Sequence, residues 1–427
     1  MDIHVVRAGE TVSSVAARYG VPAGILAGVN GVAPDAPLAV GQTLVVRHPR
    51  ELHTVASGES VYSIALRYGL SVRTLYQNNP ALGGRSALYP GQTLVIAYDD
   101  TPTRTLAVNA YSYPFIRGGL LDAALPYLTY LTPFTYGINA DGTLLPLADE
   151  WLLAAAGQYR TAALMHLSTL TEKGRFDNAR STLILEDADA QDALVQSILE
   201  TVQARHYFGL DVDFEYVLPE QREAYAAFIT RLREALNPLG CPVIVALAPK
   251  TSAAQRGLLY EAHDYALLGA AANAVFLMTY EWGYTYGPPM AVAPLGQVRA
   301  VLDYALTAVA PEKIFMGIPL YGYDWPLPFV SGETRAESLS PVQAVERALR
   351  HDIAIQYDAA AQAPYYHYTD RGGRKHTVWF EDARSIEAKL RLADEYHLQG
   401  VGYWNLTRPF PQNWAVLASL FDIETLL

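Results

Sequence analysis

The chain contains little cysteine and little charge. Its single cysteine, Cys241, excludes a disulfide within the chain, and the apolar residues 242–245 beside it predict a buried, inert thiol. Charged residues make up only 17% of the chain and hydrophobic ones 51%, a balance that supports a large core and excludes global disorder. Lys and Arg are outnumbered by Asp and Glu, 31 to 43, so the formal charge of −12 argues against nucleic acid as a partner.

The sequence also lacks any apolar run of the roughly 20 residues that a membrane-spanning helix needs. Residues 1–7 show no basic stretch followed by an apolar one, so no signal peptide is visible. We therefore expect no membrane partner, and a protein that works where it is made or reaches its site by another route. We also expect a monomer that needs no cofactor.

The first hundred residues contain two copies of one unit. Residues 4–12 match 53–61, and residues 41–45 match 91–95, with one extra residue in the second copy. The pattern of each copy predicts a strand, two short helices and a final strand. Because so small a unit buries little surface, its duplication indicates binding by avidity rather than catalysis.

The two units resemble LysM domains, through their opening Gly-Glu-Thr-Val or Gly-Glu-Ser-Val and their closing Gly-Gln-Thr-Leu. The resemblance implies binding of polymers that contain N-acetylglucosamine, such as peptidoglycan or chitin. The alternative is a pair of structural spacers. We place the two domains at residues 2–48 and 51–97, followed by a polar linker with a proline at 98–103.

The remaining residues, 104–427, alternate short apolar strands with helical patterns, which is typical of βα units. This pattern indicates one α/β domain, a (β/α)₈ barrel. The strands are expected at residues 105–110, 130–136, 163–167, 209–215, 243–248, 274–280, 314–319 and 401–404, with helices such as 191–203, 220–236, 295–308 and 385–395. The stretch at about 321–397 is too long for a simple connection and predicts a small α+β insertion over the barrel mouth. Its strands are expected near 353–357, 365–368 and 376–380.

The fourth predicted strand alternates strictly between apolar and acidic residues. Asp211, Asp213 and Glu215 project to one side, spaced roughly 6.6 Å apart as alternate residues of a strand. If this acid column faces the interior, burial and mutual repulsion keep at least one carboxyl protonated near neutral pH. A protonated carboxyl beside a carboxylate is what general acid catalysis requires.

Two other predicted strands end in aromatic residues. Tyr280 ends the sixth strand and Trp404 the eighth. In barrels of this kind the active site lies at the carboxyl ends of the strands. The phenol and the indole are therefore expected beside Glu215.

These residues together resemble family 18 glycoside hydrolases. The acid column and the glycine two residues before it resemble the DGxDxDxE strand of that family, residues 278–280 resemble its MxYD motif, and Trp404 matches its barrel-floor tryptophan. With the LysM-like repeats, the whole chain is similar to the spore-cortex-lytic N-acetylglucosaminidases of spore-forming bacteria. That resemblance implies a place at the spore coat or cortex, or at the cell wall.

The family resemblance implies a retaining, substrate-assisted mechanism, an exception to the usual scheme with two enzymic carboxylates. Glu215 is expected to protonate the leaving oxygen, while the 2-acetamido group of the substrate attacks the sugar. Asp213 is expected to hold the acetamido N–H and Tyr280 its oxygen. Asp211 is expected to share a proton with Asp213, and Trp404 to stack under the sugar.

Two positions depart from the family pattern. Phe208 replaces the first acid of the family strand, and Glu281 replaces the aspartate that follows the family tyrosine. We expect Phe208 to alter proton sharing in the column without abolishing activity. The extra methylene of Glu281 displaces its carboxylate by about a bond length, and we include it among the residues expected to contact the sugar.

Further candidates lie in loops. Aromatic residues after the sixth and seventh predicted strands can contact a glycan or only pack the rim: Trp282, Tyr284, Tyr286, Tyr321, Tyr323 and Trp325. Of these, Trp282 and Tyr323 are predicted substrate contacts. Asn109 and Tyr111 are predicted to reach the sugar, with the capping of a turn as the alternative. His166 is predicted to be a core histidine, and no metal site is expected because the acid column supplies no closed shell of ligands.

The leading hypothesis is an N-acetylglucosaminidase that acts on cortex peptidoglycan during germination, anchored by its LysM repeats. A chitinase on the same scaffold remains open, because LysM domains accept both polymers. A glycan-binding barrel without activity is the non-enzymic alternative, and the presence of Glu215 argues against it.

Overall fold

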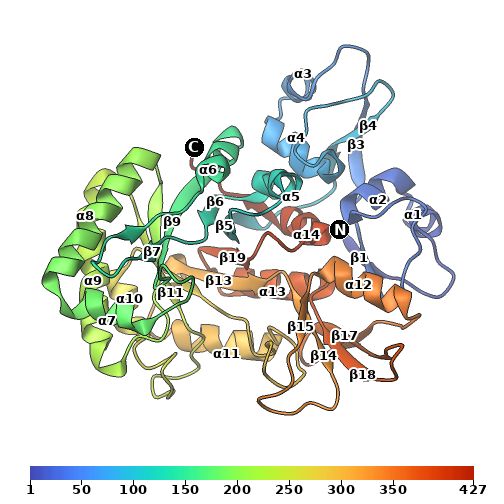
Figure 1. Ribbon diagram of the computed structural model, residues 1–427. Coiled ribbons are helices and arrows are strands. Elements are labelled where there is room, and N and C mark those ends of the chain that lie inside the picture. Colours follow the sequence, from blue (N-terminus) through green and yellow to red (C-terminus); the bar gives the residue numbers. More distant parts are fainter.

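The computed structural model describes residues 1–427, and its centre is a closed ring of eight parallel strands (Figure 1). Each strand pairs with the next along the chain, and the last, β19, pairs with the first, β5, to close the ring. The strands are β5 (Arg104–Ser112), β6 (Tyr130–Pro133), β9 (Ala162–Ser168), β10 (Gly209–Asp213), β11 (Val243–Leu247), β12 (Ala274–Leu277), β13 (Ile314–Pro319) and β19 (Gly400–Trp404). A short strand, β20 (Phe421–Ile423), adds to the start of β5. The expected (β/α)₈ barrel is confirmed.

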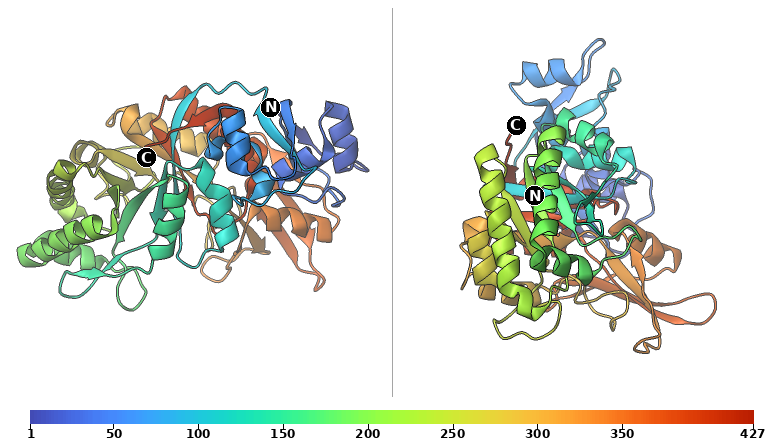
Figure 2. Two further views of the ribbon diagram at one scale, coloured as in Figure 1. Left: turned by 90° about the horizontal axis from the view of Figure 1, so that it is seen from above. Right: turned by 60° about the vertical axis from the view of Figure 1, so that its left-hand side comes forward.

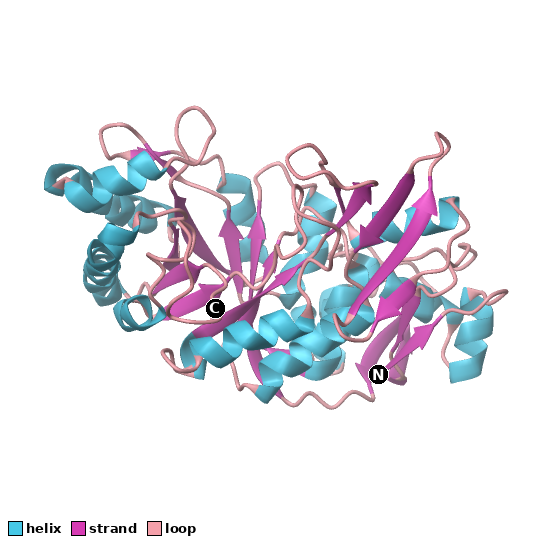
Figure 3. Cartoon of the chain, turned by 90° about the horizontal axis from the view of Figure 1, so that it is seen from below, coloured by secondary structure: helices cyan, strands magenta, loops and turns pink.

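Helices cover the outside of the barrel (Figure 3). They are α5 (Gly118–Ala124), α6 (Glu150–Gln158), α7 (Asn178–Glu186), α8 (Ala188–Arg205), α9 (Arg222–Leu236), α10 (Tyr265–Ala271), α11 (Leu295–Ala305), α13 (Ala383–Glu395) and α14 (Pro411–Leu420). In α9 the buried residues Tyr225, Phe228, Ile229 and Leu232 recur every three or four positions, so one face packs inward. Short 3₁₀ turns and a small hairpin complete the connections: η2 (Leu125–Tyr127), η3 (Pro219–Gln221), η4 (Asn237–Leu239), η5 (Pro311–Lys313), β7 (Gly137–Ile138) and β8 (Leu144–Leu145).

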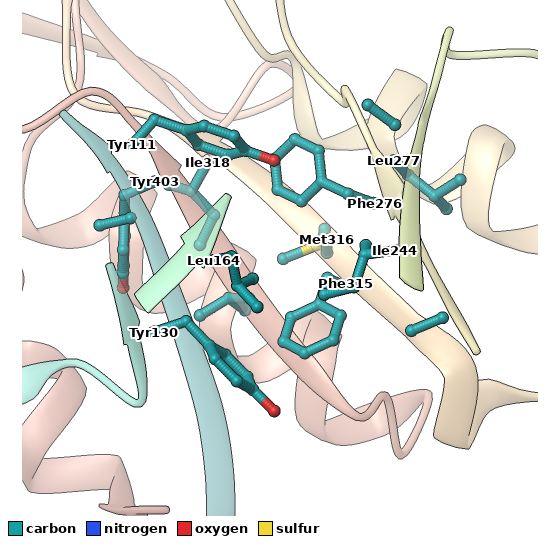
Figure 4. Close-up of a cluster of buried hydrophobic side chains, with 14 of the residues drawn as sticks. Tyr111, Tyr130, Leu164, Ile244, Phe276, Leu277, Phe315, Met316, Ile318 and Tyr403 are labelled. Carbon is teal, nitrogen blue, oxygen red and sulfur yellow. The ribbon is translucent and has the colours of Figure 1, made fainter. Parts of the chain in front are cut away.

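The interior of the barrel is filled by side chains in layers (Figure 4). The Tyr111 ring meets Phe276 edge-on at 5.2 Å between centroids, and below them Tyr130 meets Phe315 at 6.2 Å. Gly402 faces this packing, because a Cβ there would lie 2.4 Å from the Phe276 ring. A site therefore lies at an end of the barrel, and in barrels of this kind it lies at the carboxyl ends of the strands.

Several strands end earlier than the sequence pattern predicted. The expected strands 130–136, 209–215 and 274–280 stop at Pro133, Asp213 and Leu277. The alternation continues beyond these ends, but the regular ladder does not: only isolated contacts remain, such as the bridge between Tyr136 and Leu167. Glu215 and Tyr280 therefore lie in loops just above the barrel, and only Asp211 and Asp213 lie in strand β10.

The insertion between β13 and β19 is an antiparallel sheet with one helix. Its strands are β14 (Gly322–Pro326), β15 (Glu337–Leu339), β16 (Gln356–Asp358), β17 (Ala363–Thr369) and β18 (Lys375–Trp379), and its helix is α12 (Pro341–Arg350). The three expected strands correspond to β16, β17 and β18. The sequence pattern did not predict β14, β15 or α12. Helix α13 lies within the residues expected for the insertion but belongs to the barrel.

Each N-terminal repeat is a two-stranded antiparallel sheet with two helices. The first contains β1 (Asp2–Val5), α1 (Val12–Tyr19), α2 (Ala23–Asn30) and β2 (Thr43–Val46). The second contains β3 (Pro49–Thr54), α3 (Val61–Arg67), α4 (Val72–Asn78), η1 (Pro80–Leu82) and β4 (Thr93–Tyr98). No single helix of the chain is long and apolar enough to span a membrane; only α1 and α2 together, bent by 113°, have that length and composition.

The repeats lie side by side against the barrel (Figure 2). Each repeat has its own hydrophobic core of 9 buried residues, whereas the main cluster contains 90, so each core is small for an independent domain. Val29 and Val45 of the first repeat, and Val95 and Tyr98 of the second, are buried in the main cluster instead. Part of the apolar surface of each repeat is thus covered by the barrel.

Candidate active site

Asp211 is the deepest acid of the column. Its side chain is fully buried, and its Oδ2 accepts a 2.7 Å hydrogen bond from the hydroxyl of Tyr111. Burial raises the pKa of Asp211 to about 7, although the Tyr111 hydrogen bond opposes this rise. The Asp211 carboxyl is therefore poised to hold or release a proton near neutral pH.

Asp213 and Glu215 lie above it, toward the mouth. Burial, together with the charges of Glu215 and Asp211, raises the pKa of Asp213 well above its usual value. Burial and the charge of Glu281 raise the pKa of Glu215. Oδ1 of Asp211 and Oδ1 of Asp213 are buried without a hydrogen-bond partner. Unpaired buried carboxylate oxygens are costly, so these two atoms favour carboxyl groups that are not fully ionised.

His166 is a member of this cluster that the sequence reasoning did not place there. It is buried, as expected of a core histidine, but its Nε2 lies 3.9 Å from Oδ2 of Asp211 and 3.8 Å from Oδ2 of Asp213. Its Nδ1 lies 2.6 Å from the hydroxyl of Thr135, and burial lowers the pKa of His166 to about 3. A neutral imidazole therefore adjoins the acids. The register between the two strands could have predicted this position, since His166 on β9 pairs directly with Asp211 on β10.

Tyr280 and Glu281 form the second side of the site. Tyr280 is buried, and a Cβ at Gly317 would lie 2.7 Å from its ring, so a side chain at that position would displace the ring. Glu281 adopts a left-handed backbone with φ of 67°, and its Oε1 accepts hydrogen bonds from the hydroxyls of Tyr321 and Tyr323. Burial raises the pKa of Glu281, against the lowering effect of these two hydrogen bonds. Tyr323, a predicted sugar contact, is thus bonded to Glu281.

Trp404 forms an aromatic floor with residues from other strands. Its ring lies 4.8 Å from Phe134, 5.5 Å from Tyr111 and 5.9 Å from Tyr113, all edge-on. Phe134 and Tyr113 were not predicted, because they follow β6 and β5 at positions without a motif. Trp404 itself is only partly buried.

A cavity of about 800 Å³ opens beside Glu215. Tyr280, Glu281 and Trp282 line it, together with exposed rim residues that include Tyr216 and Tyr284. Its volume lies in the range that is typical of ligand-binding pockets. No set of three or more His, Cys, Asp or Glu side chains is arranged to hold a metal ion.

Several sequence candidates do not line this cavity: Tyr111, Tyr323, Trp404, Asn109, Trp325 and Phe208. Asn109 is buried in the barrel, where its Oδ1 accepts a 2.8 Å hydrogen bond from Thr132. Trp325 is fully buried, with its indole N–H bonded to the carbonyl of Gly287. Phe208, in place of an acid, precedes β10 and packs 5.8 Å from the Tyr130 ring at the opposite end of the strand from Glu215.

The chain is similar to known glycosidases and LysM proteins. Residues 171–408 match the model of glycosyl hydrolases family 18, and residues 4–47 and 53–97 match the LysM domain. The cortical fragment-lytic enzyme of Bacillus subtilis (strain 168) is 39% identical over 433 residues, which cover 99% of each chain. The spore cortex-lytic enzyme SleL of Bacillus cereus is 38% identical with a TM-score of 0.84, over 99% of this chain and 98% of that one. A chitinase of Chromobacterium violaceum ATCC 12472 is 26% identical with a TM-score of 0.69, over 74% of this chain and 98% of that one.

Proposed function

The chain belongs to glycosyl hydrolase family 18 and carries two LysM domains, and we propose that it hydrolyses N-acetylglucosaminyl bonds of spore-cortex peptidoglycan during germination. The observation that carries the proposal is the buried acid column ending at Glu215 beside an open cavity. The choice of substrate is supported by two relatives, which are named a cortical fragment-lytic enzyme and a spore cortex-lytic enzyme.

In the proposed mechanism Glu215 is the general acid. Burial and the charge of Glu281 raise the pKa of Glu215, which favours the protonated form that donates a proton to the leaving glycosidic oxygen. The acetamido carbonyl of the substrate attacks the anomeric carbon and forms an oxazolinium ion. Glu215 then acts as base for the water that opens this ion, and the anomeric configuration is retained.

The other residues hold the acetamido group for this attack. Asp213 accepts its N–H and Tyr280 donates to its oxygen, which fixes the nucleophile near the anomeric carbon. Asp211 supports Asp213 through the shared proton, and Trp404 stacks beneath the sugar. We further propose that Trp282, Tyr323, Glu281, Tyr111 and Asn109 shape the sugar subsite, with Tyr111 and Asn109 acting from below.

Soluble cortex fragments test the proposal directly. The purified protein should release new reducing ends at N-acetylglucosamine, and Glu215→Gln should lower the rate by about 10² to 10⁴-fold, the usual contribution of a general acid. Glu220→Gln changes an exposed acid five residues away and serves as the matched control. Undiminished hydrolysis by Glu215→Gln would refute the assignment, and NMR of the first-formed anomer tests retention.

Chitin is the second candidate substrate, favoured by the likeness to a bacterial chitinase over 74% of the chain. Turnover of chitin oligomers and of cortex fragments by the same preparation separates the two. A kcat/KM at least tenfold higher on chitin would reassign the enzyme as a chitinase.

We also propose that the LysM domains, at residues 2–48 and 51–97, anchor the barrel of residues 104–427 to its polymer. A place at the spore coat or cortex follows from that substrate. The protein is proposed to act as a monomer, which light scattering during gel filtration can measure.

A further inference from the structure

The two LysM domains present different surfaces, although both contain two helices between two paired strands. The hydrogen bond from the Ala39 N–H to the Gln42 side chain in the first recurs from the Tyr89 N–H to that of Gln92 in the second. These bonds align the loop that precedes the last strand of each domain. The two loops can therefore be compared position by position.

In the first domain this loop is covered by the catalytic domain. Ala39 is only 3% exposed and packs in a cluster with residues of the insertion. The Ile355 N–H donates a 2.8 Å hydrogen bond to the Val40 carbonyl, and a Cβ on Gly41 would lie 2.0 Å from the Ile355 carbonyl oxygen. Gln412 adds hydrogen bonds to the Thr43 carbonyl and to Asn30. A polymer cannot lie across this part of the first domain without displacing the insertion.

In the second domain the same loop is open. Tyr89, at the position of Ala39, is 72% exposed, and a Cβ on Gly91, at the position of Gly41, would meet nothing within 4 Å. This domain docks on the barrel through α4 instead, where Arg73 and Gln77 donate to the Pro126 carbonyl. Its helix α3 consequently stands away from the barrel (Figure 1).

The free surface of the second domain is also more apolar than that of the first. Tyr62 and Leu66 lie one turn apart on α3 and are each 68% exposed. The corresponding residues of the first domain are Ser13 and Ala17. Tyr62 and Leu66 are neighbours on one helix face, and large exposed apolar side chains that adjoin each other indicate a contact surface; Tyr89 is the third large apolar side chain that this domain exposes.

We propose that the second LysM domain alone holds the glycan polymer, through Tyr62, Leu66 and Tyr89, and that the first is a structural mount. The occupant is a strand of N-acetylglucosamine-containing glycan, whose sugar C–H faces stack on tyrosine rings while the phenol hydroxyls remain wet. This assignment rests on the proposed function, which makes such a glycan the substrate of the same chain. The buried loop of the first domain then serves to fix the second relative to the barrel.

The test is pelleting of the full-length chain with insoluble cortex peptidoglycan, in a Glu215→Gln background that leaves the polymer intact. Tyr62→Ala with Tyr89→Ala should weaken binding by about tenfold or more, in line with the loss of two stacking contacts. Ser13→Ala with Val40→Ala changes exposed residues of the first domain and should leave binding within twofold. Circular dichroism of each variant reports whether it is folded.

Equal losses from both pairs of variants, or no loss from the tyrosine pair, would overturn the proposal. A parent chain that is dimeric and becomes monomeric in the tyrosine variant would also overturn it, since the surface would then bind a second copy. Hydrolysis of soluble fragments by the active parent chain is measured separately. Its failure would count against the proposed function, whereas the pelleting result reports on the division between the domains.

Discussion

The hydroxyl of Tyr111 on β5 donates to Oδ2 of Asp211 on β10 across the barrel interior, 100 residues away in sequence. Both groups are fully buried, so this hydrogen bond is the one contact with a polar donor that favours the ionised form of Asp211. Its presence sets how readily the column takes up and loses protons.

Tyr111→Phe removes this donor while keeping the ring. The pKa of Asp211 should rise further, because burial is then opposed by no hydrogen bond. The pH profile of kcat/KM should shift to higher pH, and the maximum should fall by about tenfold, the cost of one hydrogen bond to a charged group. An unchanged profile would show that Asp211 does not titrate in the working enzyme.

Asp211→Asn should stabilise the protein at alkaline pH. The folded pKa of about 7 exceeds the unfolded value of about 3.9, so the folded state binds more protons and loses stability as pH rises through 7. The amide cannot ionise, and the variant should gain about 2 to 4 kcal/mol over the parent at pH 8 and little at pH 4. Urea unfolding of both proteins at the two pH values measures the difference in their free energies of unfolding. A difference at pH 4 as large as at pH 8 would contradict the prediction.

Glu281→Gln should narrow the pH range of activity from the alkaline side. The charge of Glu281 helps to raise the pKa of Glu215, so its removal lowers that pKa. In the proposed mechanism Glu215 then loses the proton it donates at lower pH, and the alkaline limb of kcat/KM moves to lower pH. Glu333→Gln, at an exposed acid of the insertion, is the control that should leave the limb in place.

Gly41→Ala and Gly91→Ala form a matched pair for the docking of the first repeat. Their φ angles are +83° and +86°, so an alanine costs about 1 kcal/mol of conformational strain at either position. Only the Cβ at position 41 also collides with the Ile355 carbonyl. Gly41→Ala should therefore lower the free energy of unfolding by about 1 to 3 kcal/mol more than Gly91→Ala does, as measured by thermal unfolding. Equal losses would mean that the contact with the insertion yields without cost.

The sequence predicted the barrel and the acid column because both depend on local alternation. Asp211, Asp213, Tyr280 and Trp404 carry patterns that a single segment displays. The position of His166 depends on the register between β9 and β10, which no single segment reveals.

The insertion was predicted only in part for a similar reason. Strand β14 pairs with β18, whose matching residues lie about fifty positions later, and helix α12 lies between them. The contact of Val40 with Ile355 joins residues still farther apart. Neither local periodicity nor turn chemistry predicts such pairings, so the wall over the barrel could be predicted but its attachment to the first repeat could not.

That attachment has a consequence for how the enzyme would work along a polymer. A flexible tether lets a catalytic domain sample many bonds around its anchor, at an effective concentration set by tether length. In this chain α4 contacts the barrel, and the neighbouring repeat contacts the insertion, so the second LysM domain that we propose as the anchor is held at a constant distance from Glu215. With the proposed anchor in place, each binding event would present glycosidic bonds at one distance from the binding surface, and the products should cluster in length.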